Sequence, residues 1–161
     1  MKQATKIKWK RYALYIFIAE AVGALSGFLT RDAMKLYGEQ VIQPPLSPPG
    51  WLFPVVWSIL YALMGIGAAR ISLSFPSKER TQALRIYWVQ LGFNFLWSIV
   101  FFNLQWFGFA FFWLLLLWVL ILWMIVSFRE IDLPAGNLQI PYLLWVTFAA
   151  YLNLGVWILN R

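Results

Sequence analysis

Five long apolar stretches, separated by polar or proline-containing segments, dominate the pattern of the chain. They cover residues 12–29, 51–73, 83–102, 106–128 and 138–159. Each is close to the length of about 20 residues that an α-helix needs to cross a bilayer. Asn103, Leu104 and Gln105 allow only a tight hairpin between the third and fourth stretches. We therefore predict an all-α integral membrane bundle of five transmembrane helices, forming one domain over residues 1–161.

The second predicted helix follows a proline-rich segment directly. Residues 44–51 read PPLSPPGW, and proline fixes φ and offers no backbone N–H, so this segment is a stiff loop. Trp57, Tyr61 and Met64 come next at positions i, i+4 and i+7, on one face of a helix. We expect residues 30–50 to form an outer lid loop that covers the mouth of an aromatic cavity.

Polar side chains mark one face of the third helix. Gln90, Asn94, Trp97 and Phe101 share this face, and polar groups in lipid need partners, so the face points into the bundle. Interhelical hydrogen bonding is the favoured reading for Gln90 and for Asn153 on the fifth helix. For Asn94 and Trp97, hydrogen bonding between helices and contact with a ligand are equally open.

Tryptophan is unusually frequent, and two of its positions lie well inside predicted helices. Trp51, Trp106 and Trp157 lie near helix ends, where tryptophan is typical of the membrane interface. Trp57 and Trp145 lie deeper, and their indoles could serve as bulk packing. Alternatively, two indoles facing one cavity would hold a planar aromatic ligand between them.

Glu20 interrupts the first apolar stretch. A carboxyl group inside a membrane helix is a functional hypothesis by default, and it raises the alternative of a proton-coupled small-molecule exporter that uses Glu20. The reading that we favour is a hydrogen-bonded or snorkelling side chain. Gly23 and Gly27 form a GxxxG spacing on the same helix, which fits either a homodimer face or a tight internal contact.

Composition agrees with a membrane protein and removes several kinds of chemistry. The chain is 62% hydrophobic and 12% charged, which excludes an ordinary soluble protein. It has neither cysteine nor histidine, so disulfides, thiolate or imidazole catalysis and most transition-metal sites are excluded. We therefore expect no metal site and no required cofactor.

The net charge of +7 is distributed as an orientation signal. With a cytoplasmic N-terminus, Arg31, Lys35 and Arg161 lie outside, and the remaining basic residues lie inside. We therefore expect residues 1–11 to be a basic cytoplasmic tail that contacts anionic lipid, and we expect no nucleic-acid partner. No cleavable signal peptide is evident in the first apolar stretch, so it is expected to stay as a helix. A multi-pass protein of a bacterial cell membrane is the expected location.

Three motifs together resemble the translocator protein family (TspO, the tryptophan-rich sensory proteins). They are residues 44–65, residues 90–97 with Phe101 and Phe102, and residues 141–145 followed by 148–149 and 152–153. The resemblance covers about residues 20 to 155. It implies a five-helix bundle that binds a porphyrin, such as protoporphyrin IX or a related tetrapyrrole, between its helices. It also makes a homodimer plausible.

The resemblance also suggests the site residues. Trp57 and Trp145 match positions that line the family's pocket. From their charge alone, and not from the resemblance, Arg31 or Lys35 on the outer side could meet the propionates of a porphyrin. Some bacterial members are reported to degrade porphyrin with light and oxygen, which would give the two indoles a photo-oxidative catalytic role; sensing and transport stay equally open. Leu154 stands where animal members carry the tyrosine of a sterol motif, so we do not expect tight cholesterol binding. The expected ligand contacts are Tyr37, Pro48, Trp57, Tyr61, Asn94, Trp97, Trp145 and Ala149.

Overall fold

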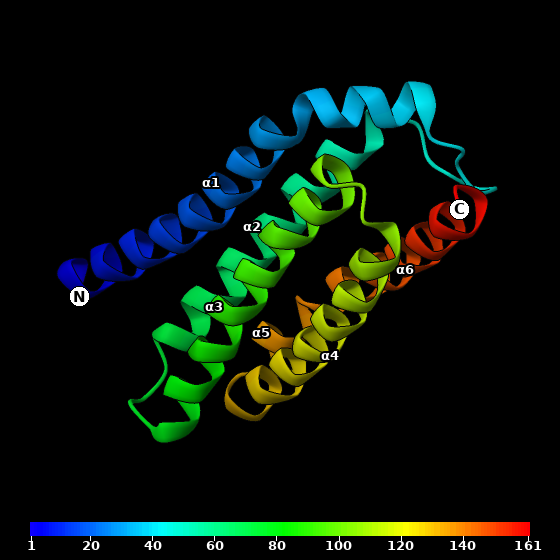
Figure 1. Cartoon of the computed structure of the whole chain (residues 1–161). Helices are drawn as coiled ribbons and strands as arrows, with labels where there is room; N and C mark the ends of the chain where they lie inside the picture. Colours follow the sequence, from blue (N-terminus) through cyan, green and yellow to red (C-terminus); the bar gives the residue numbers. More distant parts are fainter.

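The computed structural model describes residues 1–161 as a bundle of five long helices without any β-strand. Figure 1 shows α2, α3 and α4 side by side, with α1 packed mainly against α2 and diverging from the bundle toward the N-terminus. A π-helix, η1, continues α3, and a short helix, α5, joins α4 to α6. The predicted fold class, an all-α membrane bundle of five helices, is confirmed. The elements are α1 (Lys2–Gln40), α2 (Leu52–Ser72), α3 (Lys78–Ser98), η1 (Ile99–Asn103), α4 (Phe107–Ile131), α5 (Leu133–Asn137) and α6 (Ile140–Leu159).

Length and composition suit a membrane. The helices α1, α2 and α4 and the segment Leu133–Leu159 are long and apolar enough to cross a bilayer. The 21-residue α3 is as long as α2 but more polar, and it packs against α2 and α4. A regular buried stripe on α4 supplies much of the core, as expected for a helix with one face in the bundle and one in lipid: Leu114, Leu117, Ile121, Met124, Ile125 and Phe128.

The first helix is much longer than predicted. The expected loop over residues 30–50 is wrong in its first part, because α1 continues to Gln40. Residues 30–40 contain no proline, and the helix ends only as the chain approaches Pro44 and Pro45, which disfavour helical backbone. Residues 2–11, expected as a tail, are also helical. The loop proper is therefore residues 41–50, called the proline loop below.

The 39 residues of α1 make it about 58 Å long, roughly twice the thickness of the hydrocarbon core. Its exposed N-terminal turns stand clear of the bundle, and its direction changes before its last turns (Figure 1). The Thr30 hydroxyl donates to the carbonyl of Ser26 at 2.7 Å, a bond of the kind that bends helices. The bend turns the last part of α1 over one end of the bundle.

Two other helix boundaries differ from the prediction for local reasons. The helix α3 begins at Lys78 instead of residue 83, because the Ser77 hydroxyl accepts the backbone N–H of Arg80 at 3.0 Å and caps the helix. After α4 the chain forms the unpredicted α5, which has Pro134 in its first turn.

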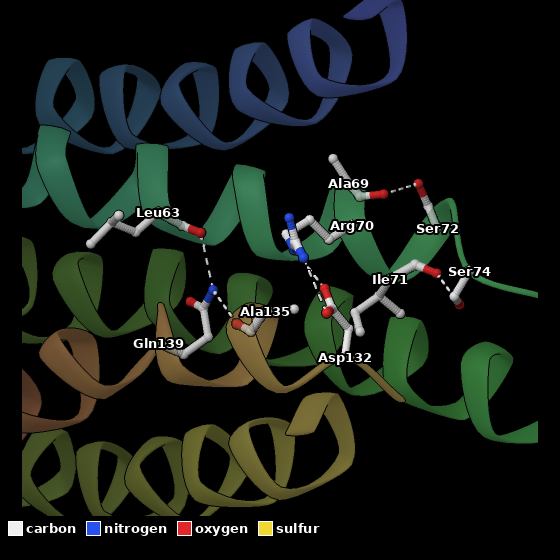
Figure 2. A network of polar contacts seen from close by, with 9 residues as sticks. All are labelled: Leu63, Ala69, Arg70, Ile71, Ser72, Ser74, Asp132, Ala135 and Gln139. Atoms are coloured by element: carbon white, nitrogen blue, oxygen red, sulfur yellow. Dashed lines mark hydrogen bonds and ion pairs between the residues drawn. The ribbon is translucent and has the colours of Figure 1, made fainter. Parts of the chain in front are cut away.

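A polar clamp holds α5 and the end of α4 against α2 (Figure 2). The Arg70 guanidinium makes two hydrogen bonds to the Asp132 carboxylate, with Nε–Oδ2 at 2.5 Å and Nη2–Oδ1 at 3.1 Å. Such a forked pair fixes both distance and orientation. The buried Gln139 donates from Nε2 to the carbonyl oxygens of Leu63 at 3.0 Å and Ala135 at 3.4 Å. These bonds set where α6 begins relative to α2.

The closest approach of α1 to α2 depends on Gly65. A Cβ atom at Gly65 would lie 2.6 Å from the Cα of Ile16, so the two backbones are in direct contact. Small residues permit this close packing of membrane helices. Since α1 also supplies one wall of the cavity described below, the contact determines how near that wall lies to α2.

Replacing Gly65 by alanine should therefore destabilise the bundle by about 1–3 kcal/mol, because the added methyl overlaps backbone atoms that cannot rotate away. The matched control is Gly92→Ala in α3, where a Cβ meets nothing within 4 Å. The control should be neutral or stabilising. Thermal unfolding of the detergent-purified variants measures both, and equal melting temperatures would contradict the close contact.

Candidate functional site

A cavity of about 520 Å³ lies between α1, α2, the α3–η1 segment and α6. Small-molecule sites usually have about 300–1,000 Å³, so the cavity has the size of a ligand pocket. Its walls differ in character. The walls from α2, α3, η1 and α6 are largely aromatic, and the wall from α1 carries small and polar side chains.

Aromatic side chains from separate helices meet at this cavity. Trp57 and Tyr61 on α2 lie with ring centroids 5.6 Å apart, and both line the cavity. Phe53 on α2 meets Trp145 on α6 edge to face at 5.9 Å. Trp97 on α3 completes the set. The arrangement offers several flat apolar faces to one volume, which favours a planar ligand.

The α1 wall is flat because it is built from small residues. A Cβ at Gly23 would lie 2.5 Å from Cε2 of Tyr61, so the tyrosine ring rests on the α1 backbone. Gly27 lines the cavity and has nothing within 4 Å of its Cβ position. Of the two GxxxG residues, Gly23 therefore serves an internal contact, and Gly27 forms part of the cavity wall.

A buried hydrogen-bond chain lies behind the aromatic wall and joins three helices. The Tyr61 hydroxyl donates to Oδ1 of Asn94 at 2.8 Å, and Nδ2 of Asn94 donates to the Tyr142 hydroxyl at 2.7 Å. That hydroxyl donates in turn to Oε1 of Gln90 at 2.8 Å. Gln90 thus acts between helices as predicted. Asn94 has the same role and reaches the cavity only through Tyr61.

Trp97 has both a structural and a cavity-facing role. Its indole N–H donates to Oδ1 of Asn153 at 3.1 Å, and Nδ2 of Asn153 donates to the carbonyl of Phe107 at 2.8 Å. The ring stacks on Phe101 at 5.0 Å. These contacts fix the orientation of the indole at the cavity. Asn153 joins helices, as the sequence predicted.

The structure brings most of the predicted site residues to one place. Five of them line the cavity: Trp57, Tyr61, Trp97, Trp145 and Ala149. Asn94 lies behind the wall. Tyr37 is outside the cavity and packs on Phe101 and Phe102, with ring centroids 5.5 Å and 5.3 Å away.

Pro48 also lies outside the cavity, because the proline loop is fastened to α6 instead of lying over the opening. Asn160 exchanges two hydrogen bonds with the backbone of Ile42, at 2.9 Å and 2.8 Å. The Tyr151 hydroxyl donates to the carbonyl of Pro45 at 2.8 Å. No residue of the proline loop lines the cavity, whereas Thr30, Arg31 and Met34 of α1 do.

The sequence pointed to Glu20 and Arg31 as candidates, but it did not predict that α1 forms a whole wall of the cavity. Eight cavity residues come from this helix, among them Glu20, Thr30, Arg31 and Met34. Glu20, Gly23, Gly27 and Arg31 are spaced to share one face of a helix, and this spacing could have indicated the α1 wall. The full pattern requires a helix that continues past residue 30, which the sequence did not predict. Arg31 lines the cavity and Lys35 does not.

Comparisons with known proteins decide the family. A sequence profile described as the TspO/MBR family matches residues 15–158 of the chain. The chain belongs to the TspO/MBR family. Protein CrtK of Rhodobacter capsulatus is 36% identical over 150 residues, which cover 92% of each chain. The tryptophan-rich protein TspO of Chlorobaculum tepidum is 34% identical over 149 residues, covering 92% of this chain and 94% of the relative. The human translocator protein is 29% identical over 149 residues.

Membership in this family agrees with the resemblance seen in the three sequence motifs, and it identifies the chain as a membrane protein. None of these relatives carries the name of an exporter, so the alternative of a proton-coupled exporter is not favoured. Glu20 nevertheless lies in the wall of the cavity described above.

Replacing Asn94 by leucine should lower the free energy of unfolding by about 1–3 kcal/mol, since Tyr61 loses its acceptor and Tyr142 its donor in a buried site. The control is Asn103→Leu, whose exposed amide makes one bond to the carbonyl of Leu29. Thermal unfolding in detergent compares them. If Asn94→Leu lowers the stability no more than Asn103→Leu does, the buried hydrogen-bond chain contributes little to the stability of the bundle.

Proposed function

We propose that this TspO-family protein is a membrane receptor for a planar hydrophobic ligand of the porphyrin class, protoporphyrin IX or a related tetrapyrrole. The observation that carries the proposal is the meeting of Trp57, Tyr61, Trp97 and Trp145 around one cavity of about 520 Å³. Stacking on these rings would supply most of the binding energy. The chain needs no metal or additional cofactor for this role.

Charge at the cavity supports an acidic ligand edge near the bend of α1. Arg31 is the one basic residue that lines the cavity. Its guanidinium lies 4.6 Å from the centroid of Phe28 and 3.8 Å from a carboxylate oxygen of Asp32, at an exposed position. A porphyrin seated against the indoles could turn its propionates toward this guanidinium.

The site would also place oxidisable indoles beside a bound porphyrin. In light, an excited porphyrin and molecular oxygen supply the oxidising chemistry, and Trp57 and Trp145 are the side chains that would react first or relay the electron. This reaction would make the protein a porphyrin-degrading enzyme. Binding without reaction would fit a sensor or a transporter instead.

We expect Trp57→Phe and Trp145→Phe each to weaken the binding of protoporphyrin IX at least tenfold, about 1.4 kcal/mol, because the smaller ring loses stacking area. Tryptophan-fluorescence titration in the dark with detergent-purified protein measures the affinity. Trp123→Phe is the matched control, since this indole is 49% exposed on α4, outside the cavity. It should leave the affinity unchanged.

Two results would contradict the proposal. If protoporphyrin IX does not quench the wild-type protein saturably, the porphyrin is not its ligand. If all three variants bind it with equal affinity, the binding site is not this cavity. Where binding is saturable, illuminating the complex in air and following the porphyrin absorbance distinguishes degradation from binding alone.

We also propose that the protein lies in a bacterial cell membrane with its N-terminus in the cytoplasm. The exposed N-terminal turns of α1 carry four lysines and Arg11, which suits the cytoplasmic side and its anionic lipids. The proline loop then lies on the outer face.

The absence of cysteine allows a direct test of this orientation. A membrane-impermeant maleimide on intact spheroplasts should label Gln43→Cys in the proline loop, and it should label Lys6→Cys only after permeabilisation. Both positions are exposed. The reverse labelling pattern would contradict the proposed orientation.

A further inference from the structure

Glu20 lies in the cavity wall at a place where no other acidic side chain is near. It is on α1, one turn before Gly23, whose backbone supports the ring of Tyr61. Glu20 and Arg31 are the only charged residues that line the cavity. The cavity is otherwise formed by aromatic, small and neutral polar side chains, so this carboxyl group is a distinct chemical feature.

The carboxyl group of Glu20 has no partner within the protein. It takes part in no side-chain hydrogen bond, and the ion pairs of the chain are Arg31–Asp32 and Arg70–Asp132. An acidic group within a membrane bundle ordinarily pairs with another group, because leaving it unpaired in apolar surroundings is costly.

The neighbouring side chains do not meet this need. The Tyr61 hydroxyl gives its only proton to Asn94, so it has none for Glu20. Arg31 lies eleven positions further along α1, about 16 Å away at the rise of an α-helix. The two charges therefore sit toward opposite ends of the same wall.

We propose that Glu20 determines specificity by accepting a hydrogen bond or an ion pair from a nitrogen donor on the edge of the planar ligand. Such a bond is strongest between a carboxylate oxygen and a charged amine nitrogen, and a neutral amide oxygen in the same place would lack the charge that strengthens it. With Arg31 at the other end, the wall selects ligands that carry a nitrogen donor at one edge and an acidic group at the other. This inference rests on the proposed ligand-binding function of the cavity, and among tetrapyrroles it favours one with an N–H group at its edge over protoporphyrin IX, whose N–H groups lie inside the ring.

A matched pair of planar probes tests the inference. Pyrenemethylamine carries an ammonium group on a planar aromatic body, and pyrenemethyl methyl ether has the same body without a donor. Wild-type protein should bind the amine at least tenfold more tightly than the ether, measured by energy transfer from tryptophan to pyrene. Glu20→Gln should weaken amine binding at least tenfold and leave the ether unchanged.

Two further variants serve as controls. Glu39→Gln makes the same change on the same helix at an exposed position outside the cavity, and it should keep the amine preference. Glu20→Asp retains the acidic group one methylene shorter and should keep most of the preference. This second variant also covers the case in which Glu20→Gln fails to fold.

Several outcomes would overturn the role of Glu20. The first is that the wild-type protein binds both probes with equal affinity. The second is that Glu20→Gln weakens the binding of the amine and the ether equally. The third is that the wild-type protein binds neither probe saturably. A protoporphyrin IX titration of the same samples separates this inference from the proposed function. Porphyrin binding without an amine preference rejects only the role of Glu20, whereas a Glu20-dependent amine preference without porphyrin binding rejects only the porphyrin.

Discussion

The hydrogen-bond chain from Tyr61 through Asn94 and Tyr142 to Gln90 is the interaction on which the bundle depends. Lipid offers no hydrogen bonds, so a polar side chain in a membrane helix must be satisfied by another helix. Each member of this chain is buried, and together they fix α2, α3 and α6 at one level. The same bonds orient the Tyr61 ring toward the cavity. The position of the Tyr61 ring at the cavity is therefore a consequence of how the bundle satisfies its polar groups.

The cavity exists because α2 and α6 meet through large side chains. Trp57 lies 6.2 Å from Tyr142, and Phe53 lies 5.9 Å from Trp145, measured between ring centroids. Rings of this size hold the two backbones apart, and the flat backbone of α1 at Gly23 and Gly27 closes the volume on one side. The cavity is thus a space bounded by largely aromatic walls from α2, α3–η1 and α6, and by the small and polar residues of α1 on the fourth side.

The position of α1 gives the cavity its polarity. The contact between Ile16 of α1 and Gly65 of α2 brings the two helices together. The bend in α1 then carries its last turns across the end of the bundle (Figure 1). Glu20 and Arg31 consequently line the same cavity at different levels along α1. The proline loop, held to α6 by Asn160 and Tyr151, anchors the far end of α1 instead of covering the opening.

The sequence by itself determined the class of the protein, its five helices, its family and the aromatic residues of the site, because apolar length and the spacing of Trp57, Tyr61 and Trp97 depend on local helix geometry and on lipid. It did not determine the end of α1, since residues 30–40 hold polar side chains that suit a loop as well as a helix. Only the tertiary structure placed Tyr37 and Pro48 outside the cavity and Glu20 and Arg31 in its wall. Which face of a long helix meets which neighbour follows from contacts between distant segments, such as Gly65 with Ile16, that no local pattern encodes.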